Sequence, residues 1–92
     1  MLNTAFQSPE EVLATLGQRL RALRDNRGLT QQEVADRAGI STRSLRTLEN
    51  GDGSNLATLV RVLKALDATQ GLDALVPEPS VSPMQLLRQR RG

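Results

Sequence analysis

Apolar residues recur at helical spacing along most of this chain, and local capping signals mark where each predicted helix begins. The first helix is predicted to start after Ser8, with Pro9 at its first position and a following glutamate completing a capping box, and to end at Gly28. A later helix is expected to follow a cap at Ser54 or Asn55, and a short fifth helix is predicted over residues 71–76. The apolar stripes of these three helices are Val12, Leu13, Leu16, Leu20 and Leu23; Leu56, Leu59, Val60, Val62, Leu63 and Leu66; and Leu72, Leu75 and Val76.

Two short helices are predicted between these elements, on either side of Gly39. Thr30 caps the first, with Glu33 completing a capping box, and the positive φ available to Gly39 ends it. Ser41 caps the second, which the pair Asn50-Gly51 is expected to close in left-handed conformations. The inward positions are Val34, Ala35 and Ala38 on the first helix and Leu45 and Leu48 on the second.

The outward side of the second short helix is polar and basic. It carries Thr42, Arg43, Arg46 and Thr47. Two helices joined by a tight turn at a steep angle present the second helix to the DNA major groove, whose width admits one helix. The pattern therefore predicts a helix-turn-helix that presents the polar side of its second helix to DNA.

The capping residues, the Ala-x-x-x-Gly-Ile-Ser pattern from Ala35 and the run Leu48-Glu-Asn-Gly together resemble the Cro/C1 (XRE) family of helix-turn-helix repressors. The resemblance covers residues 16–66. It implies an all-α, five-helix, lambda-repressor-like domain, which the prolines of residues 77–83 predict to be followed by an extended C-terminal tail. It also implies that Arg24 and Glu49 form a structural ion pair.

The same resemblance implies roles on DNA. Thr42, Arg43 and Thr47 match base-contacting positions of the family, and Arg46 lies between them and is assigned with them. The residues assigned to phosphate contacts are Gln31, Ser41, Ser44 and Asn50. Many phage members carry Gln at the reading positions, so the operator sequence cannot be transferred. Because arginine pairs with guanine O6 and N7, we expect Arg43 to read a guanine.

Composition excludes several other functions. The 92 residues contain no Cys and no His, so disulfides, thiolate or imidazole zinc sites and Ser-His-Asp triads are excluded. No carboxylates form a plausible catalytic pair, and no enzyme activity, metal or cofactor is expected. The net charge is only +2, with arginines concentrated from Arg19 to Arg46. Neither a signal peptide nor a membrane span is recognisable, which predicts a bacterial cytoplasmic, nucleoid-associated protein.

The last part of the chain differs from the rest. Residues 77–83 contain three prolines, so the predicted divisions are an arm (1–8), the helix-turn-helix domain (9–76) and a basic tail (77–92). Three interpretations of the tail remain open: a disordered basic segment, a segment that folds on a partner protein, or one that docks on its own dimer. The residues expected to bind a partner are Met84, Leu86, Leu87 and Arg88.

A helix-turn-helix unit with a proline-containing tail resembles HipB-like antitoxins, whose partners are HipA-like kinase toxins. This resemblance implies a homodimer that binds double-stranded operator DNA, represses its own toxin–antitoxin operon and holds the toxin. The apolar edge of the fifth helix, where members of the larger family usually dimerise, is a candidate dimer interface. The alternative is an autonomous XRE-family transcriptional regulator without a toxin partner.

Overall fold

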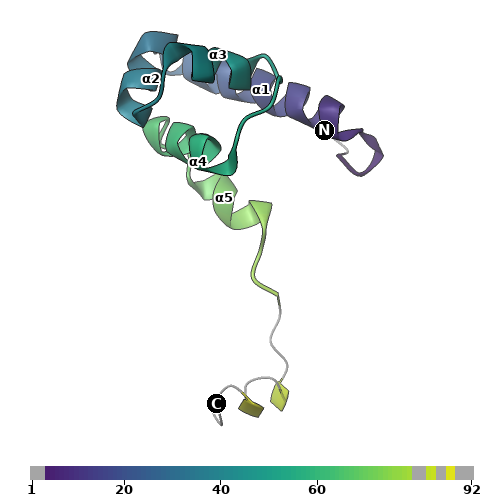
Figure 1. Cartoon of the computed structure of the whole chain (residues 1–92). Coiled ribbons are helices and arrows are strands. Elements are labelled where there is room, and N and C mark those ends of the chain that lie inside the picture. Colours follow the sequence, from purple (N-terminus) through teal and green to yellow (C-terminus); the bar gives the residue numbers. More distant parts are fainter. Residues whose placement is uncertain (1–3, 80–82, 85–86, 89–92) are drawn as a thin grey trace.

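The computed structural model describes residues 4–79, 83–84 and 87–88. These residues form five α-helices and one 3-10 turn, without strands, which confirms the predicted all-α fold (Figure 1). No helix among them is long and apolar enough to cross a membrane. The elements are η1 (Thr4–Phe6), α1 (Pro9–Asn26), α2 (Gln31–Ala38), α3 (Thr42–Glu49), α4 (Leu56–Ala65) and α5 (Gln70–Leu75).

Side-chain caps determine where four of the helices begin. Ser8 and Thr30 each form a capping box with the glutamate three residues later, as predicted. Ser41 caps α3 and Asn55, rather than Ser54, caps α4. The hydrogen bond that Glu33 accepts from the Thr30 backbone N–H lowers the pKa of its carboxyl group. Local hydrogen bonds therefore satisfy donors that the first turn of a helix leaves free.

One small core joins the first four helices. Gly39 ends α2 with φ of 69°, and the tight turn brings α3 across α2. The closing turn of α3 differs from the prediction, because Asn50 is right-handed and only Gly51 adopts positive φ. A single glycine suffices for that reversal. The buried apolar residues are Leu20, Val34, Ala35, Ala38, Leu45, Leu48, Val62 and Leu66.

Some predicted apolar positions lie outside this core. Leu13 is 38% exposed, Leu56 is 68% exposed, and Leu75 and Val76 of the fifth helix are 55% and 80% exposed. Leu13 and Leu56 border an open groove between α1 and α4, and Leu75 lines the continuation of that groove along α5. The apolar sides of α1 and α4 were assigned correctly, but no element within the described residues covers the edges of those sides. The fifth helix also begins one residue earlier than predicted and ends at Leu75.

The groove between α1 and α4 continues along α5. Its main part is a pocket of about 470 Å³, and a smaller pocket of about 170 Å³ adjoins it near the start of α4. Both pockets are lined by Leu16 and Leu59. After α5 the chain leaves the helices through the exposed residues 77–79 (Figure 1). The leucines of the main pocket are Leu16, Leu20, Leu23, Leu59, Leu63, Leu72 and Leu75.

Candidate nucleic-acid interface

Helix α3 has one buried side and one polar side. Leu45, Leu48 and Glu49 are buried, with Leu45 fully inaccessible to solvent. At about 100° per residue, the four predicted base-contacting side chains fall within an arc of about 140° on the remaining surface. Within it Arg43 and Arg46 are exposed and Thr42 and Thr47 are half-buried. The structure thus brings all four predicted positions together on the side of α3 that faces away from the core.

A buried ion pair holds the C-terminal end of α3. Arg24 Nε lies 2.7 Å from Glu49 Oε2, and Arg24 Nη2 donates to Glu49 Oε1 over 3.0 Å. Gln31 Nε2 donates to the same Glu49 Oε1 over 3.1 Å. The hydrogen bonds to Glu49 raise the pKa of the Arg24 guanidinium, against the opposing effect of burial. This contact joins α1, α2 and α3, so it sets the orientation of the polar side of α3.

Two glycines allow α3 and its closing turn to lie directly on α1. A Cβ at Gly17 would lie 2.7 Å from the Leu48 carbonyl oxygen and still closer to that of Glu49. A Cβ at Gly51 would lie 2.6 Å from Ala14 Cα, and its φ of 77° also favours glycine. The reason for a glycine within α1, which helical propensity alone disfavours, is therefore this close backbone approach.

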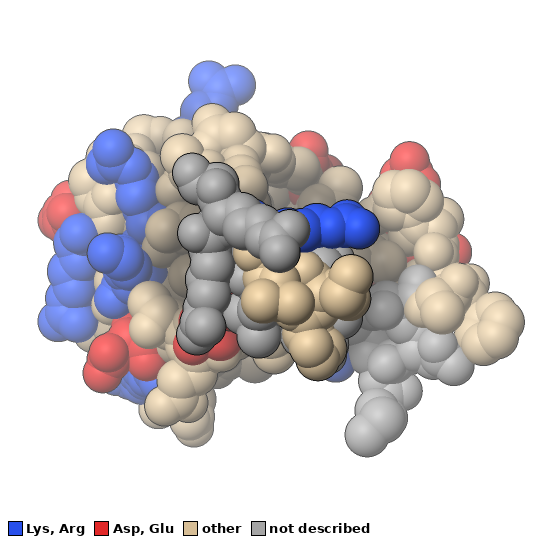
Figure 2. Space-filling view, turned by 90° about the horizontal axis from the view of Figure 1, so that it is seen from below, with Lys and Arg blue, Asp and Glu red and all other residues tan. Residues whose placement is uncertain are grey.

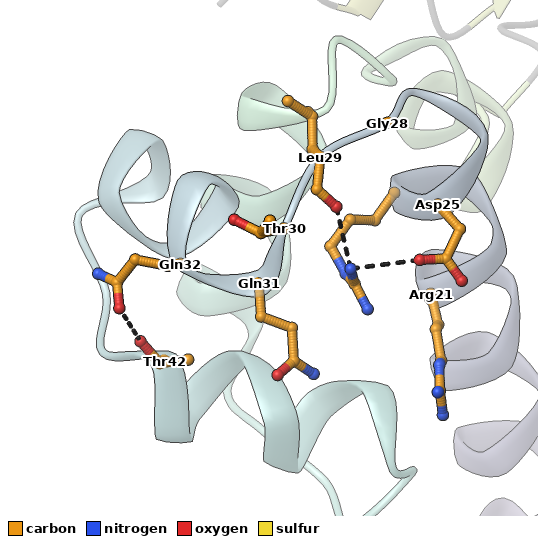
Figure 3. A pocket seen from close by; sticks show the side chains of 9 residues that line it. Arg21, Asp25, Gly28, Leu29, Thr30, Gln31, Gln32 and Thr42 are labelled. Carbon is orange, nitrogen blue, oxygen red and sulfur yellow. Dashed lines mark hydrogen bonds and ion pairs between the residues drawn. The ribbon is translucent and has the colours of Figure 1, made fainter.

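An open polar pocket lies between α1 and the N-terminal ends of α2 and α3 (Figure 3). Its volume is about 640 Å³. Figure 3 shows the Arg21, Gln31 and Thr42 side chains around it, with the Thr42 hydroxyl hydrogen-bonded to Gln32. The Arg21 guanidinium of α1 and the Gln31 amide of α2 offer donors to an anionic group in this pocket. Its lining residues are Arg21, Arg24, Asp25, Gly28, Leu29, Thr30, Gln31, Gln32 and Thr42.

The predicted phosphate-contacting residues lie around α3, and their roles stay predictions. Gln31 is half-buried, and one of its amide hydrogens is used by Glu49. Ser41 Oγ accepts the Ser44 backbone N–H over 3.0 Å, and the two hydroxyls lie 2.9 Å apart. Asn50 is exposed at the C-terminal end of the helix. Ser41 therefore has a structural role in capping that accompanies any role on DNA.

The far side of α3 borders a second, smaller polar pocket of about 280 Å³. Arg43, Ser44 and Thr47 line it together with the loop before α4 and the first turns of that helix. The Thr47 hydroxyl donates to the Arg43 backbone carbonyl over 2.9 Å. Since this bond uses its only hydrogen, Thr47 can offer DNA lone pairs and a methyl group.

The predicted partner-binding residues of the tail are only partly within the described residues. Met84 is 62% exposed and Leu87 is 50% exposed, and Arg88 is also exposed. Leu86 lies outside the described residues. Two apolar side chains of the tail are thus available to another surface, and their role stays a prediction.

Sequence reasoning missed three polar residues beside α3. Arg21 and Gln32 line the larger pocket with Thr42, and Asp36 accepts a hydrogen bond from Gln32. The four-residue spacing of Gln32 and Asp36 on an exposed helix face was a usable signal, because such pairs meet on a helix. The contact of Gln32 with Thr42 had no such signal in the sequence, because it depends on how α2 and α3 cross.

Positive charge is not confined to α3. Helix α3 lies at the top of Figure 1, and Figure 2 shows the molecule from below. On that lower face, Lys and Arg side chains lie along one side, with Asp and Glu side chains among them. With a net charge of only +2, overall electrostatic attraction does not single out one face. What distinguishes α3 as the candidate DNA-contacting helix is therefore the set of polar side chains that it holds in a fixed arrangement.

The comparisons with known proteins agree with this geometry. A family model described as a helix-turn-helix domain matches residues 15–75, which includes all of α2, α3 and α4. The chain is also 28% identical over 74 residues to a Pyrococcus furiosus protein named "Putative HTH-type transcriptional regulatory protein". That match covers 80% of this chain and 21% of the relative, so the chain spans about a fifth of the relative's length. The chain belongs to the helix-turn-helix domain family.

Proposed function

We propose that this protein is a sequence-specific DNA-binding transcriptional regulator that inserts α3 into the major groove. The observation that carries the proposal is the arrangement of Thr42, Arg43, Arg46 and Thr47 on one exposed side of a helix whose other side is anchored by the buried Arg24–Glu49 pair. Exposed arginines on a rigidly held helix suit recognition of guanine edges and phosphates. The name of the Pyrococcus furiosus relative is consistent with this role.

Replacement of Arg43 tests the proposal at one residue. Arg43→Ala should cost about 1–3 kcal/mol of binding free energy at the preferred duplex and relax base choice at one position, because a bidentate contact with guanine is lost. The preferred duplex is obtained by selection from a random library, and affinities are measured by fluorescence anisotropy at one fixed salt concentration. Arg61→Ala, which removes an exposed arginine of α4, is the matched control. Equal weakening on all sequences would make Arg43 a phosphate contact instead.

We further propose that the regulator acts as a homodimer and as a repressor. The leucine-lined groove and the exposed Leu75 and Val76 of the α5 region provide apolar surface for a second copy. A two-fold dimer would place two α3 helices one DNA turn apart, roughly 34 Å, on a palindromic operator. Occupation of such a site excludes other proteins from the same DNA, which is the simplest route to repression.

The finer role we infer is that of antitoxin and autorepressor of a HipBA-like operon, in which residues 9–76 bind DNA and residues 77–92 contact a HipA-like kinase. The exposed Met84 and Leu87, which follow the proline-containing segment, favour this role. Co-purification from the native host should recover a kinase-like protein with the full chain and not with a chain ending at Val76, while both retain operator DNA. Recovery of DNA alone by both chains would instead indicate an autonomous regulator.

A further inference from the structure

Three polar side chains form a hydrogen-bonded series at the edge of the polar side of α3. Gln32 Nε2 donates to Asp36 Oδ1 over 2.8 Å, and Gln32 Oε1 accepts from the Thr42 hydroxyl over 3.1 Å. Figure 3 shows the second of these bonds, which crosses from α2 to the first residue of α3. Gln32 and Asp36 are exposed and one helical turn apart on α2.

The chemistry of Asp36 determines the direction of both bonds. An ionised carboxylate can only accept, so the Gln32 amide must turn its NH₂ group toward Asp36. The amide carbonyl then faces Thr42, and the hydroxyl of Thr42 must donate to it. Although amide orientations depend on their hydrogen-bond network, this network admits only one arrangement. The single hydroxyl hydrogen of Thr42 is therefore directed toward Gln32.

A threonine hydroxyl with its hydrogen engaged presents only lone pairs to a ligand. In the major groove, adenine N6 and cytosine N4 are donors, whereas guanine O6 and N7 and thymine O4 are acceptors. A hydroxyl that rotates freely can satisfy either kind of base edge. One that is held as an acceptor can bond only to an exocyclic amine.

We propose that Gln32 and Asp36 are positioning residues that hold the Thr42 hydroxyl as an acceptor, so that Thr42 selects the exocyclic amine of adenine or cytosine. This inference rests on the proposed function, because it requires α3 to read base edges. It adds to that function two residues of α2, neither of which has to touch a base. The specificity of α3 at its N-terminal end is therefore set partly by the neighbouring helix.

The test uses the full chain and a duplex selected from a random library. The position read by Thr42 is the one at which Thr42→Val changes base preference. Replacing the amine-bearing base there by an analogue without the amine, such as purine in place of adenine, should weaken wild-type binding about fivefold, the size of one net hydrogen bond. Thr42→Val, which keeps the methyl group but lacks the hydroxyl, should bind both duplexes equally.

The positioning role is tested by Gln32→Met and Asp36→Ala. Each substitution should reduce the fivefold preference for the duplex that carries the amine to less than about twofold, and should allow guanine or thymine at that position. In the Thr42→Val background, neither substitution should have a further effect. Gln18→Met, which replaces an exposed glutamine of α1, is the control and should leave base choice unchanged. A purely structural role would lower the thermal stability without altering preference at one position.

Two outcomes overturn the inference in distinguishable ways. If the wild-type chain selects a sequence and Arg43→Ala alters it, but Gln32→Met leaves discrimination at the Thr42 position intact, the positioning role is wrong and the proposed function stands. If the wild-type chain selects no sequence from the library, the proposed function and this inference both fail.

Discussion

Arg24→Met should lower the free energy of unfolding by about 3–5 kcal/mol, because it leaves the Glu49 carboxylate buried without its cation. The Glu49 side chain is only 2% exposed and would retain a single hydrogen bond, from Gln31. A loss of this size lowers Tm by more than about 10 °C in a domain of this length. Urea denaturation of the full chain, monitored by circular dichroism, measures this loss of unfolding free energy.

Two further variants separate the buried pair from ordinary surface charge. Asp25→Asn removes a carboxylate that also lies 3.3 Å from Arg24 but is 62% exposed, so its cost should not exceed about 1 kcal/mol. The double replacement Arg24→Met with Glu49→Leu should recover most of the stability, since two packed apolar side chains carry no unpaired charge. A cost of Arg24→Met as small as that of Asp25→Asn would contradict a role for the pair in holding α3.

Gly17→Ala should destabilise the fold by about 1–3 kcal/mol or more, although alanine is the better helix former. The added methyl group would meet the backbone carbonyl oxygens of Leu48 and Glu49, which cannot move without shifting the end of α3. We therefore expect weaker DNA binding as well as a lower Tm, because the same displacement tilts the polar side of α3. Denaturant titration and anisotropy on the selected duplex measure the two effects.

Gly71→Ala is the matched control for that substitution. Gly71 also lies within a helix, but a Cβ there would have nothing within 4 Å. Alanine at this position should stabilise the protein slightly, by up to about 1 kcal/mol, through helix propensity alone. If both alanine variants had the same effect, the close approach of α1 and α3 at Gly17 would not constrain the fold.

Local features were predictable because their causes lie within a few residues of sequence. The cap at Ser41 requires only a side-chain oxygen and a backbone N–H three residues later. The capping boxes at Ser8 and Thr30 need in addition only a glutamate at that third position. The positive φ of Gly39 follows from the same local geometry. Helical periodicity also placed Leu45 and Leu48 in the core. The helix-turn-helix could thus be located before its packing was known.

Features that depend on how helices cross were not predictable in this way. Periodicity identified the apolar sides of α1 and α4, but it could not show that Leu13 and Leu56 would border an open groove. The contacts of Gly17 with the end of α3 and of Gln32 with Thr42 join residues that are 31–32 and 10 positions apart. The Arg24–Glu49 pair was predicted only through family resemblance, for the same reason.

The most direct test of DNA recognition by α3 is a comparison of ¹⁵N–¹H NMR spectra of the full chain with and without its selected duplex. If α3 enters the major groove, amide chemical shifts should change most along α3 and at the N-terminal end of α2, including those of Gln31, Gln32 and Thr42. The amide shifts of residues along the groove between α1 and α4 should change little. Changes concentrated in that groove, with α3 unaffected, would contradict recognition of DNA by α3.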